Sequence, residues 1–346
     1  MNRRALLPTL ALASALSLSL SGCLAGENAS DTGPASADGS TQGGTLNIDF
    51  ATYNPLSLIV KEQGWLEEEL AEQDMTVNWV QSAGSNKANE ALRAGAIDVG
   101  STAGSAALLA RSNGSPIKTI DIYSQPEWSA LVTLPDSGIT SVEDLRGKSV
   151  AATRGTDPYF FLLQALESAG VEQSEVTIEN LQHADGRSAL ASGAVDAWAG
   201  LDPIMAAAEQ DGAQLFFRDI DFNSYGFLNA TEDFLTEQPD VAQTVVNAYE
   251  KARQWAKENP EETAAILADV AGIDPSVASS VIIDRTNLVV DPAPGDAQRS
   301  VLEKIGPVFV ETGDVQSQEQ IDEALESLFD ASLVEKADPD AIGSDS

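Results

Sequence analysis

The sequence predicts an α/β protein. Short apolar strands alternate with helices from Thr45 onward, which is typical of a mostly parallel sheet. Residues 149–159 form one such unit, a strand followed by a Gly155 turn and a helix start. A second observation is an internal echo, because residues 91–100 and 189–198 match at five of ten positions, each as a helix end, a glycine and a strand that carries an aspartate. Chance similarity in an alanine-rich chain is the alternative, but the shared helix–glycine–strand context favours two related lobes.

The alternation assigns the elements in order. Strands are expected at 45–49, 77–80, 97–100, 117–123, 129–134, 148–153, 175–181, 194–198, 215–217 and 225–229. Helices are expected at 55–70, 85–93, 103–111, 141–145, 158–169, from 185, at 202–210, and throughout the chain after Thr231, where the last two span 298–312 and 319–336.

Composition excludes some functions. The chain has 346 residues, with 19 Lys and Arg against 54 Asp and Glu, for a net charge of −35. Nucleic-acid binding is disfavoured, because phosphate contacts need a basic surface. The acidity indicates a well-solvated surface and does not report the charge of a buried ligand.

The N-terminus predicts the compartment. Arg3 and Arg4 precede an apolar run at 5–20, which ends at Cys23, the single cysteine. This arrangement resembles a bacterial lipobox, so we expect a lipoprotein signal peptide at 1–22, a diacylated Cys23, a flexible tether to residue 44 and an extracytoplasmic protein anchored to the membrane. The alternative is an ordinary signal peptide with an incidental cysteine. Residues 337–346 are expected to be a disordered tail.

Polar residues stand where four predicted strands meet the following helices. These junctions are 82–86, 100–104, 155–158 and 202–203. The first amides of a helix lack internal partners and can hold an anion, so these amides and the hydroxyls of Ser85, Thr102 and Thr156 could surround a small oxyanion. Each junction alone is more often a plain helix cap, and Asp157 and Asp202, each followed by proline, are expected as caps rather than catalytic acids.

Other residue types narrow the chemistry. Aromatic residues that could line a pocket, or pack in the core, are Tyr53, Trp128, Tyr159, Trp198 and Tyr225. His183 is the single histidine, so a zinc site of ordinary composition is not expected, and we expect His183 in a loop near the cleft. The nucleophile elbow, the Walker sequence and the dinucleotide fingerprint do not occur in the sequence. We therefore expect no cofactor, no metal and no enzyme activity.

Six motifs, in the same order along the chain, resemble one family. They are YNPLSL at 53–58, KEQGWL at 61–66, GSNK at 84–87, GSTAG at 100–104, TDPY at 156–159 and DAWAGLDP at 196–203. They are similar to the solute-binding proteins of ABC importers for aliphatic sulfonates, taurine and nitrate. The resemblance implies a two-lobed periplasmic-binding-protein fold of type II. Lobe 1 would take 45–134 and 229–336, lobe 2 would take 135–228, and crossing strands would lie near 131–136 and 227–231.

The resemblance also implies a site and partners. Its ligand-binding residues would be Tyr53, Asn54, Ser85, Asn86, Thr102, Gly104, Trp128, Thr156, Asp157, Trp198 and Asp202, with Tyr225 and His183 in addition. The expected function is capture of an aliphatic sulfonate by a monomer that delivers it to a cognate permease and ATPase. Taurine, nitrate or a thiamine-precursor pyrimidine are alternative ligands, and a sensor lipoprotein is an alternative role. Taurine becomes the more plausible ligand if the acids Glu127 and Asp202 face the cleft, and a plain alkanesulfonate is favoured if they face away.

Overall fold

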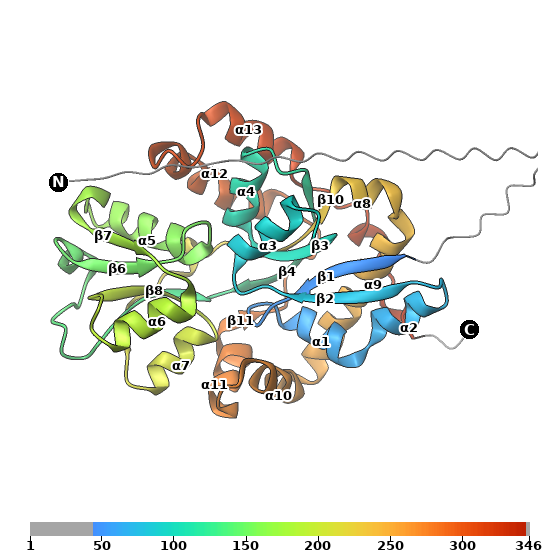
Figure 1. Cartoon of the computed structure of the whole chain (residues 1–346), viewed down its shortest axis with the longest axis horizontal. Coiled ribbons are helices and arrows are strands. Elements are labelled where there is room, and N and C mark those ends of the chain that lie inside the picture. The colour runs from blue at the N-terminus through green and yellow to red at the C-terminus, as the bar shows by residue number, and fades with distance from the viewer. Residues whose placement is uncertain (1–43, 344–346) are drawn as a thin grey trace, which may run out of the picture. The chain divides into compact units, whose positions relative to one another are not determined.

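The strands of the protein form two sheets, and the predicted α/β class is confirmed. The computed structural model describes residues 44–343, all within the unit Thr41–Ser346 (Figure 1). One sheet has six strands in the order β11 (Thr286–Asn287), β4 (Ile117–Pro126), β10 (Gly226–Thr231), β3 (Val99–Ala103), β1 (Thr45–Phe50) and β2 (Thr76–Gln81). The other has five, in the order β7 (Thr177–Asn180), β6 (Ser149–Ala152), β8 (Ala197–Leu201), β5 (Ser129–Thr133) and β9 (Gln214–Phe217). The predicted lipobox, Cys23 and most of the tether lie outside the described residues.

The two sheets repeat one pairing pattern. In the first, β1 pairs in parallel with β2 and β3, and β10 lies antiparallel to β3. In the second, β6 pairs in parallel with β7 and β8, and β5 lies antiparallel to β8. The antiparallel strand of each sheet comes from a segment that has just left the other sheet.

The helices follow the predicted order with local differences. They are α1 (Pro55–Gln63), α2 (Trp65–Ala71), α3 (Ser85–Arg93), α4 (Gly104–Ser112), α5 (Asp157–Ser168), α6 (His183–Ala191), α7 (Ile204–Gln210), α8 (Glu232–Glu237), α9 (Pro239–Glu258), α10 (Pro260–Ala271), α11 (Pro275–Ser279), a π-helix (Ser280–Arg285), α12 (Asp296–Glu311) and α13 (Gln318–Ser327). The single helix expected at 55–70 is wrong, because Gly64 adopts a left-handed φ of 69° and divides it. The helix expected at 319–336 stops at Ser327. Among the described residues, none of the helices has the length and apolar character needed to span a membrane.

The chain crosses between the sheets twice. It leaves β4 at Pro126 and enters β5 at Ser129, and it returns through residues 218–225 between β9 and β10. Both crossings therefore lie earlier than expected, since residue 131 is already inside the five-stranded sheet and residues 227–231 are already inside β10 of the six-stranded sheet. Below, the "five-stranded half" means that sheet with α5, α6 and α7, and the "six-stranded half" means the other sheet with the remaining helices.

Candidate functional site

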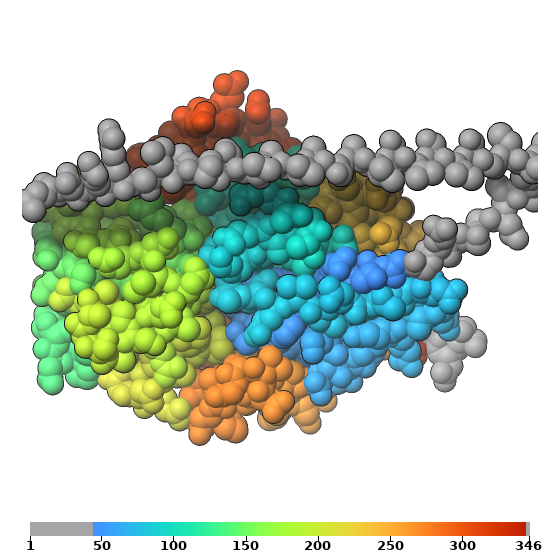
Figure 2. Space-filling model, viewed as in Figure 1, coloured from blue at the N-terminus to red at the C-terminus, as the bar shows by residue number. Residues whose placement is uncertain are grey.

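The predicted strand-to-helix junctions of both halves come into contact. Within the six-stranded half, the Ser85 hydroxyl at the start of α3 accepts a hydrogen bond from the Ala103 amide at 2.9 Å. Between the halves, the Ser105 hydroxyl of α4 donates to Asp157 of α5 at 2.6 Å. In Figure 2 the cyan surface that includes α3 adjoins the yellow-green surface that includes α6. The structure thus brings the junctions of the two halves together.

Asp157 is the centre of this contact. Its buried carboxylate accepts four hydrogen bonds, from the Ser105 hydroxyl at 2.6 Å, the Ser224 hydroxyl at 2.6 Å, the Ser224 amide at 2.9 Å and the Trp128 indole at 2.7 Å. Burial raises the pKa of Asp157, although all four donors favour the charged form. One side chain of the five-stranded half is therefore bonded to α4 and to both crossing segments.

The assignment of Asp157 as a helix cap was wrong. Thr156 occupies the N-cap position of α5, and Asp157 is the first helical residue. The Thr156 hydroxyl donates to the Thr153 carbonyl at 2.6 Å, so it braces the turn. Ser85 likewise is the first residue of α3, with Gly84 at the N-cap.

Several predicted site residues form a polar network inside the six-stranded half. The Tyr53 hydroxyl donates to the Ser101 carbonyl at 2.9 Å. Asn54 caps α1 through its side-chain oxygen and donates to the Ser101 hydroxyl at 2.7 Å. Thr102 accepts from Asn229 at 2.8 Å. These groups hold β1, β3 and β10 at the edge where the halves meet.

Gly104 and Tyr225 meet at the second crossing segment. The Gly104 amide donates to the Tyr225 carbonyl at 2.8 Å. A Cβ on Gly104 would lie 2.8 Å from the Phe227 ring, so a larger residue does not fit here without displacing that ring. Burial raises the pKa of the half-buried Tyr225.

Trp198 lies in the core of the five-stranded half. It is fully buried among Ala130, Ala151, Leu190 and Met205. A Cβ on Gly186 of α6 would come within 2.7 Å of its indole nitrogen, so the ring lies directly under that helix. Trp198 therefore packs between sheet and helix, which was the alternative to a place in the pocket wall.

The acids Glu127 and Asp202 are both paired with arginines. Arg218 binds Glu127 through two hydrogen bonds of 3.0 and 2.7 Å. Arg285, at the end of the π-helix, donates to both oxygens of Asp202 at 3.2 Å. Asp202 also accepts from the Ala206 amide at 2.9 Å, but Pro203 occupies the N-cap position of α7, so Asp202 lies one residue before the position predicted for it.

Burial and ion pairing act in opposite directions on the Asp202–Arg285 pair. Burial raises the pKa of Asp202 to about 6, and the guanidinium only partly offsets that effect. The pKa of Arg285 is raised by its carboxylate partners, Asp202 among them, although burial opposes this. Burial is the dominant effect on Asp202, because this residue is only 3% exposed. Sequence reasoning missed Arg285, because a basic residue at the end of a helix carries no local signal of a distant partner.

A small cavity lies beside this pair. Its volume is about 10 Å³, and its lining includes Tyr53, Trp128, Asp202 and Arg285. That volume holds about one water molecule. The rings of Tyr53 and Trp128 meet edge to face with centroids 6.0 Å apart. Sequence reasoning placed these two aromatics at one site, and the structure brings them together.

His183 and Asn86 both lie against Gly84 at the junction of the halves. A Cβ on Gly84 would lie 3.0 Å from the Asn86 side-chain oxygen and 3.1 Å from His183 Nε2. Within the part of the chain that the structure describes, neither of these buried atoms has a hydrogen-bond partner. His183 begins α6 rather than lying in a loop. Lys87 and Arg154 are engaged elsewhere, Lys87 with Glu90 at 2.8 Å and Arg154 over the Tyr159 ring.

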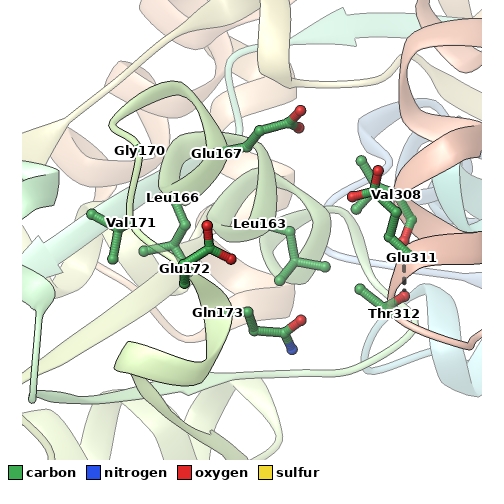
Figure 3. A pocket seen from close by; sticks show the side chains of 10 residues that line it. All are labelled: Leu163, Leu166, Glu167, Gly170, Val171, Glu172, Gln173, Val308, Glu311 and Thr312. Carbon is green, nitrogen blue, oxygen red and sulfur yellow. Dashed lines mark hydrogen bonds between the residues drawn. The ribbon is translucent and has the colours of Figure 1, made fainter.

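A separate surface pocket lies between α5 and α12 (Figure 3). Its volume is about 360 Å³, and its walls combine Leu163, Leu166 and Val308 with the carboxylates of Glu167 and Glu311. A carboxylate-lined pocket does not suit an anion, so this pocket is a poor candidate for the predicted site. Among the described residues, no cluster of three or more His, Cys, Asp or Glu side chains could hold a metal ion.

Comparison with known proteins identifies the family. The family described as "NMT1/THI5 like" matches residues 57–263. The chain belongs to this family. A Bacillus subtilis protein named for binding aliphatic sulfonates is 30% identical over 67% of this chain and 70% of its own length. An Escherichia coli protein of the same name is 28% identical over 71% of this chain and 78% of its own length, and the E. coli taurine-binding periplasmic protein is 26% identical over 68% and 75%.

Solved structures agree with the family fold. The alkanesulfonate-binding protein of Xanthomonas axonopodis pv. citri superposes with a TM-score of 0.72, covering 81% of this chain and 97% of the other at 24% identity. The periplasmic aliphatic sulphonate-binding protein of E. coli gives 0.68, covering 81% and 91% at 25% identity. The predicted periplasmic-binding-protein fold is therefore confirmed, and the chain is a solute-binding protein rather than an enzyme.

Proposed function

We propose that this protein captures small aliphatic sulfonates outside the cytoplasm and delivers them to an ABC importer. The observation that carries the proposal is the group of relatives named for sulfonate and taurine binding, matched over more than two thirds of their lengths. Diacylation of Cys23 would hold the protein at the membrane. A permease and its ATPase would be the partners, and the protein would act as a monomer.

We propose that the two halves are the lobes of the receptor. The sheets suggest lobe boundaries at the two crossing segments, 127–128 and 218–225, so that β5 belongs to lobe 2 and β10 to lobe 1. The ligand would be bound between the lobes by helix N-termini, hydroxyls and aromatic rings. Support for this place comes from the helix starts that meet there, because the first amides of α3, which follows Gly84, and of α6, which begins at His183, have no partner within their own helices and can bind an anion.

The charge of the junction favours a sulfonate without an amine. Taurine carries an ammonium group that would need a free carboxylate. Glu127 and Asp202 are instead neutralised by Arg218 and Arg285, and Asp157 is saturated by four donors. Arg285 also lines the cavity beside Tyr53 and Trp128, where it is paired with both Asp202 and Glu209. We therefore propose plain alkanesulfonates as ligands ahead of taurine, nitrate or pyrimidines.

A thermal-shift panel tests the function. The purified chain would be heated with C1–C6 alkanesulfonates, taurine, nitrate, sulfate and a thiamine-precursor pyrimidine. A bound alkanesulfonate at a hundredfold excess over its dissociation constant should stabilise the fold by about 2.7 kcal/mol. The absence of a shift with every sulfonate contradicts the proposal. Labelled palmitate should enter the wild-type chain but not Cys23→Ser, and equal labelling would contradict the anchor.

A further inference from the structure

His183 contacts the opposite half of the molecule. It is the single histidine of the chain and the first residue of α6 in the five-stranded half. Its side chain is buried, with only 1% of the residue exposed. Nε2 and Cδ2 would stand 3.1 and 3.2 Å from a Cβ on Gly84, which precedes α3 in the six-stranded half. The imidazole is therefore buried by contact between the halves and loses that cover if they separate.

The hydrogen bonds of Thr153 fix the tautomer of His183. The Thr153 hydroxyl donates its only proton to the Leu181 carbonyl at 2.7 Å. At 3.2 Å from His183 Nδ1, the same oxygen is left to accept, so Nδ1 carries the proton. Nε2 is then a bare acceptor, and it has no partner among the described residues. A proton on Nε2 would create a buried charge with an unpaired N–H.

The charged groups around His183 do not favour an imidazolium. On α3, Lys87 is paired with Glu90. At the start of α5, Asp157 is saturated by its four donors, and Arg154 lies over Tyr159. On α6 itself, Asp185 is exposed and Arg187 is paired with Asp211. The neighbouring strand β7 carries Glu179, which is exposed. Burial alone lowers the pKa of His183, to about 4.

We propose that contact between the two halves requires a neutral His183, so that closure of the receptor is coupled to release of one proton. The inference rests on the proposed function in so far as ligand capture strengthens this contact, which the protein also makes through its own residues, Ser105 with Asp157 and Gly84 with His183. Its consequence is that the closed, ligand-holding form is favoured at neutral pH and is weakened in mild acid.

The sign follows from the two states of the imidazole. In separated halves His183 is hydrated and has an ordinary pKa near 6.5, whereas in contact its pKa is about 4. Below about pH 6.5 the open form takes up a proton that the closed form does not bind. Closure is therefore unaffected above that pH and is lost progressively between 6.5 and 4. Between pH 7 and 5, these two values give about a twentyfold loss of ligand affinity.

The experiment compares wild type with His183→Gln at pH 7 and pH 5. The affinity for butanesulfonate should fall about twentyfold in wild type and change much less in the variant. Asp49 and Asp202, whose pKa values are about 6, titrate in both proteins, so the difference between the proteins isolates His183. The ring proton of the single histidine, followed by NMR, should titrate at a lower pH when butanesulfonate is bound.

Two further measurements keep the outcome decisive. Gly84→Ala should weaken binding at both pH values, because its Cβ meets the imidazole. Small-angle scattering without ligand should show wild type, but not His183→Gln, becoming less compact at pH 5. A His183 pKa that rises on ligand binding overturns the proposal, because the imidazolium would then donate to the anion. If no sulfonate binds at all, the proposed function fails. The scattering measurement needs no ligand, so it still tests the requirement for a neutral His183. Equal dimensions of the wild-type protein at both pH values overturn that requirement.

Discussion

The two halves of the molecule share one framework. The Asp98 carboxylate accepts a hydrogen bond from the Asn47 amide at 2.8 Å, and the Asp98 amide donates to the Asn47 carbonyl at 2.7 Å. Asp196 does the same with Ser149, at 2.8 and 2.9 Å. Each aspartate thus links the strand beside the sheet edge, β1 or β6, to the start of its neighbouring strand, β3 or β8. The repeated sequence segments therefore make equivalent hydrogen bonds in the two halves.

The halves differ at the first turn of the repeated helix. With the same offset that aligns the aspartates, Ser85 of α3 corresponds to His183 of α6, and Ala88 corresponds to Gly186. The Ser85 hydroxyl bonds within its own half, whereas His183 contacts the other half. The repeated residues build the sheets, and the diverged residues at the strand ends make the contacts between the halves. Ligand specificity is thus expected to depend on the diverged residues.

The largest expected effect on stability comes from removing the guanidinium of Arg285, which pairs with Asp202. Arg285→Gln should lower the free energy of unfolding by about 4 kcal/mol at pH 7, because Asp202 stays buried without its partner. At pH 5 the loss should be smaller, since burial holds the pKa of Asp202 at about 6 and a protonated carboxyl needs no cation. Urea denaturation at both pH values measures this.

Arg218→Gln is the matched control. Its partner Glu127 also accepts two hydrogen bonds, from two guanidinium nitrogens rather than one, and is closer to solvent. The loss should stay below about 1 kcal/mol at either pH. Equal losses for the two arginines would show that burial does not distinguish the pairs.

The second effect concerns Asp157. Asp157→Asn should cost about 3 kcal/mol, because an amide oxygen accepts fewer of the four hydrogen bonds and its NH₂ opposes the Ser105 and Ser224 donors. Thermal unfolding followed by circular dichroism measures the loss. Asp185→Asn, an exposed aspartate in the first turn of α6, should change stability by less than about 0.5 kcal/mol. If Asp157→Asn leaves the stability unchanged, this carboxylate does not hold the halves together.

The third effect separates helix propensity from packing. By propensity alone, Gly186→Ala in α6 should stabilise the protein by about 1 kcal/mol. The Trp198 indole would lie 2.7 Å from the new Cβ, so we expect a loss of about 2 kcal/mol instead. Gly170→Ala cannot serve as the control for this variant, since Gly170 has a left-handed φ of 63°, at which alanine is strained. The control is Ala88→Gly at the corresponding position of α3, which should lose about 1 kcal/mol. Stabilisation by Gly186→Ala would contradict the packing.

The sequence predicted the framework better than the junctions. The alternation of strands and helices and the echo around Asp98 and Asp196 depend on local pattern and were predictable, whereas Tyr53 and Trp128 were assigned to one site by the family resemblance. The partners of Asp157 were not, because Ser105 and Ser224 are 52 and 67 residues away in sequence. A local reading gave Asp157 the commonest role for an aspartate before proline, that of a cap. Trp198 was assigned to a pocket because its place at a strand end does not reveal which face of the sheet it occupies.

The smallest expected effect tests the equivalence of the halves directly. Asp98→Ala and Asp196→Ala should each lower the free energy of unfolding by about 1 kcal/mol, because each removes the acceptor of a strand amide in a partly exposed position. The losses should agree within about 0.5 kcal/mol and add in the double variant, since the sites share no partner. Hydrogen bonds, first that from the Ser149 amide, lower the pKa of Asp196, so its contribution should be present above about pH 4 and fade as the pH falls further. A loss confined to one aspartate would mean that the two frameworks have the same hydrogen bonds but contribute unequally to the stability.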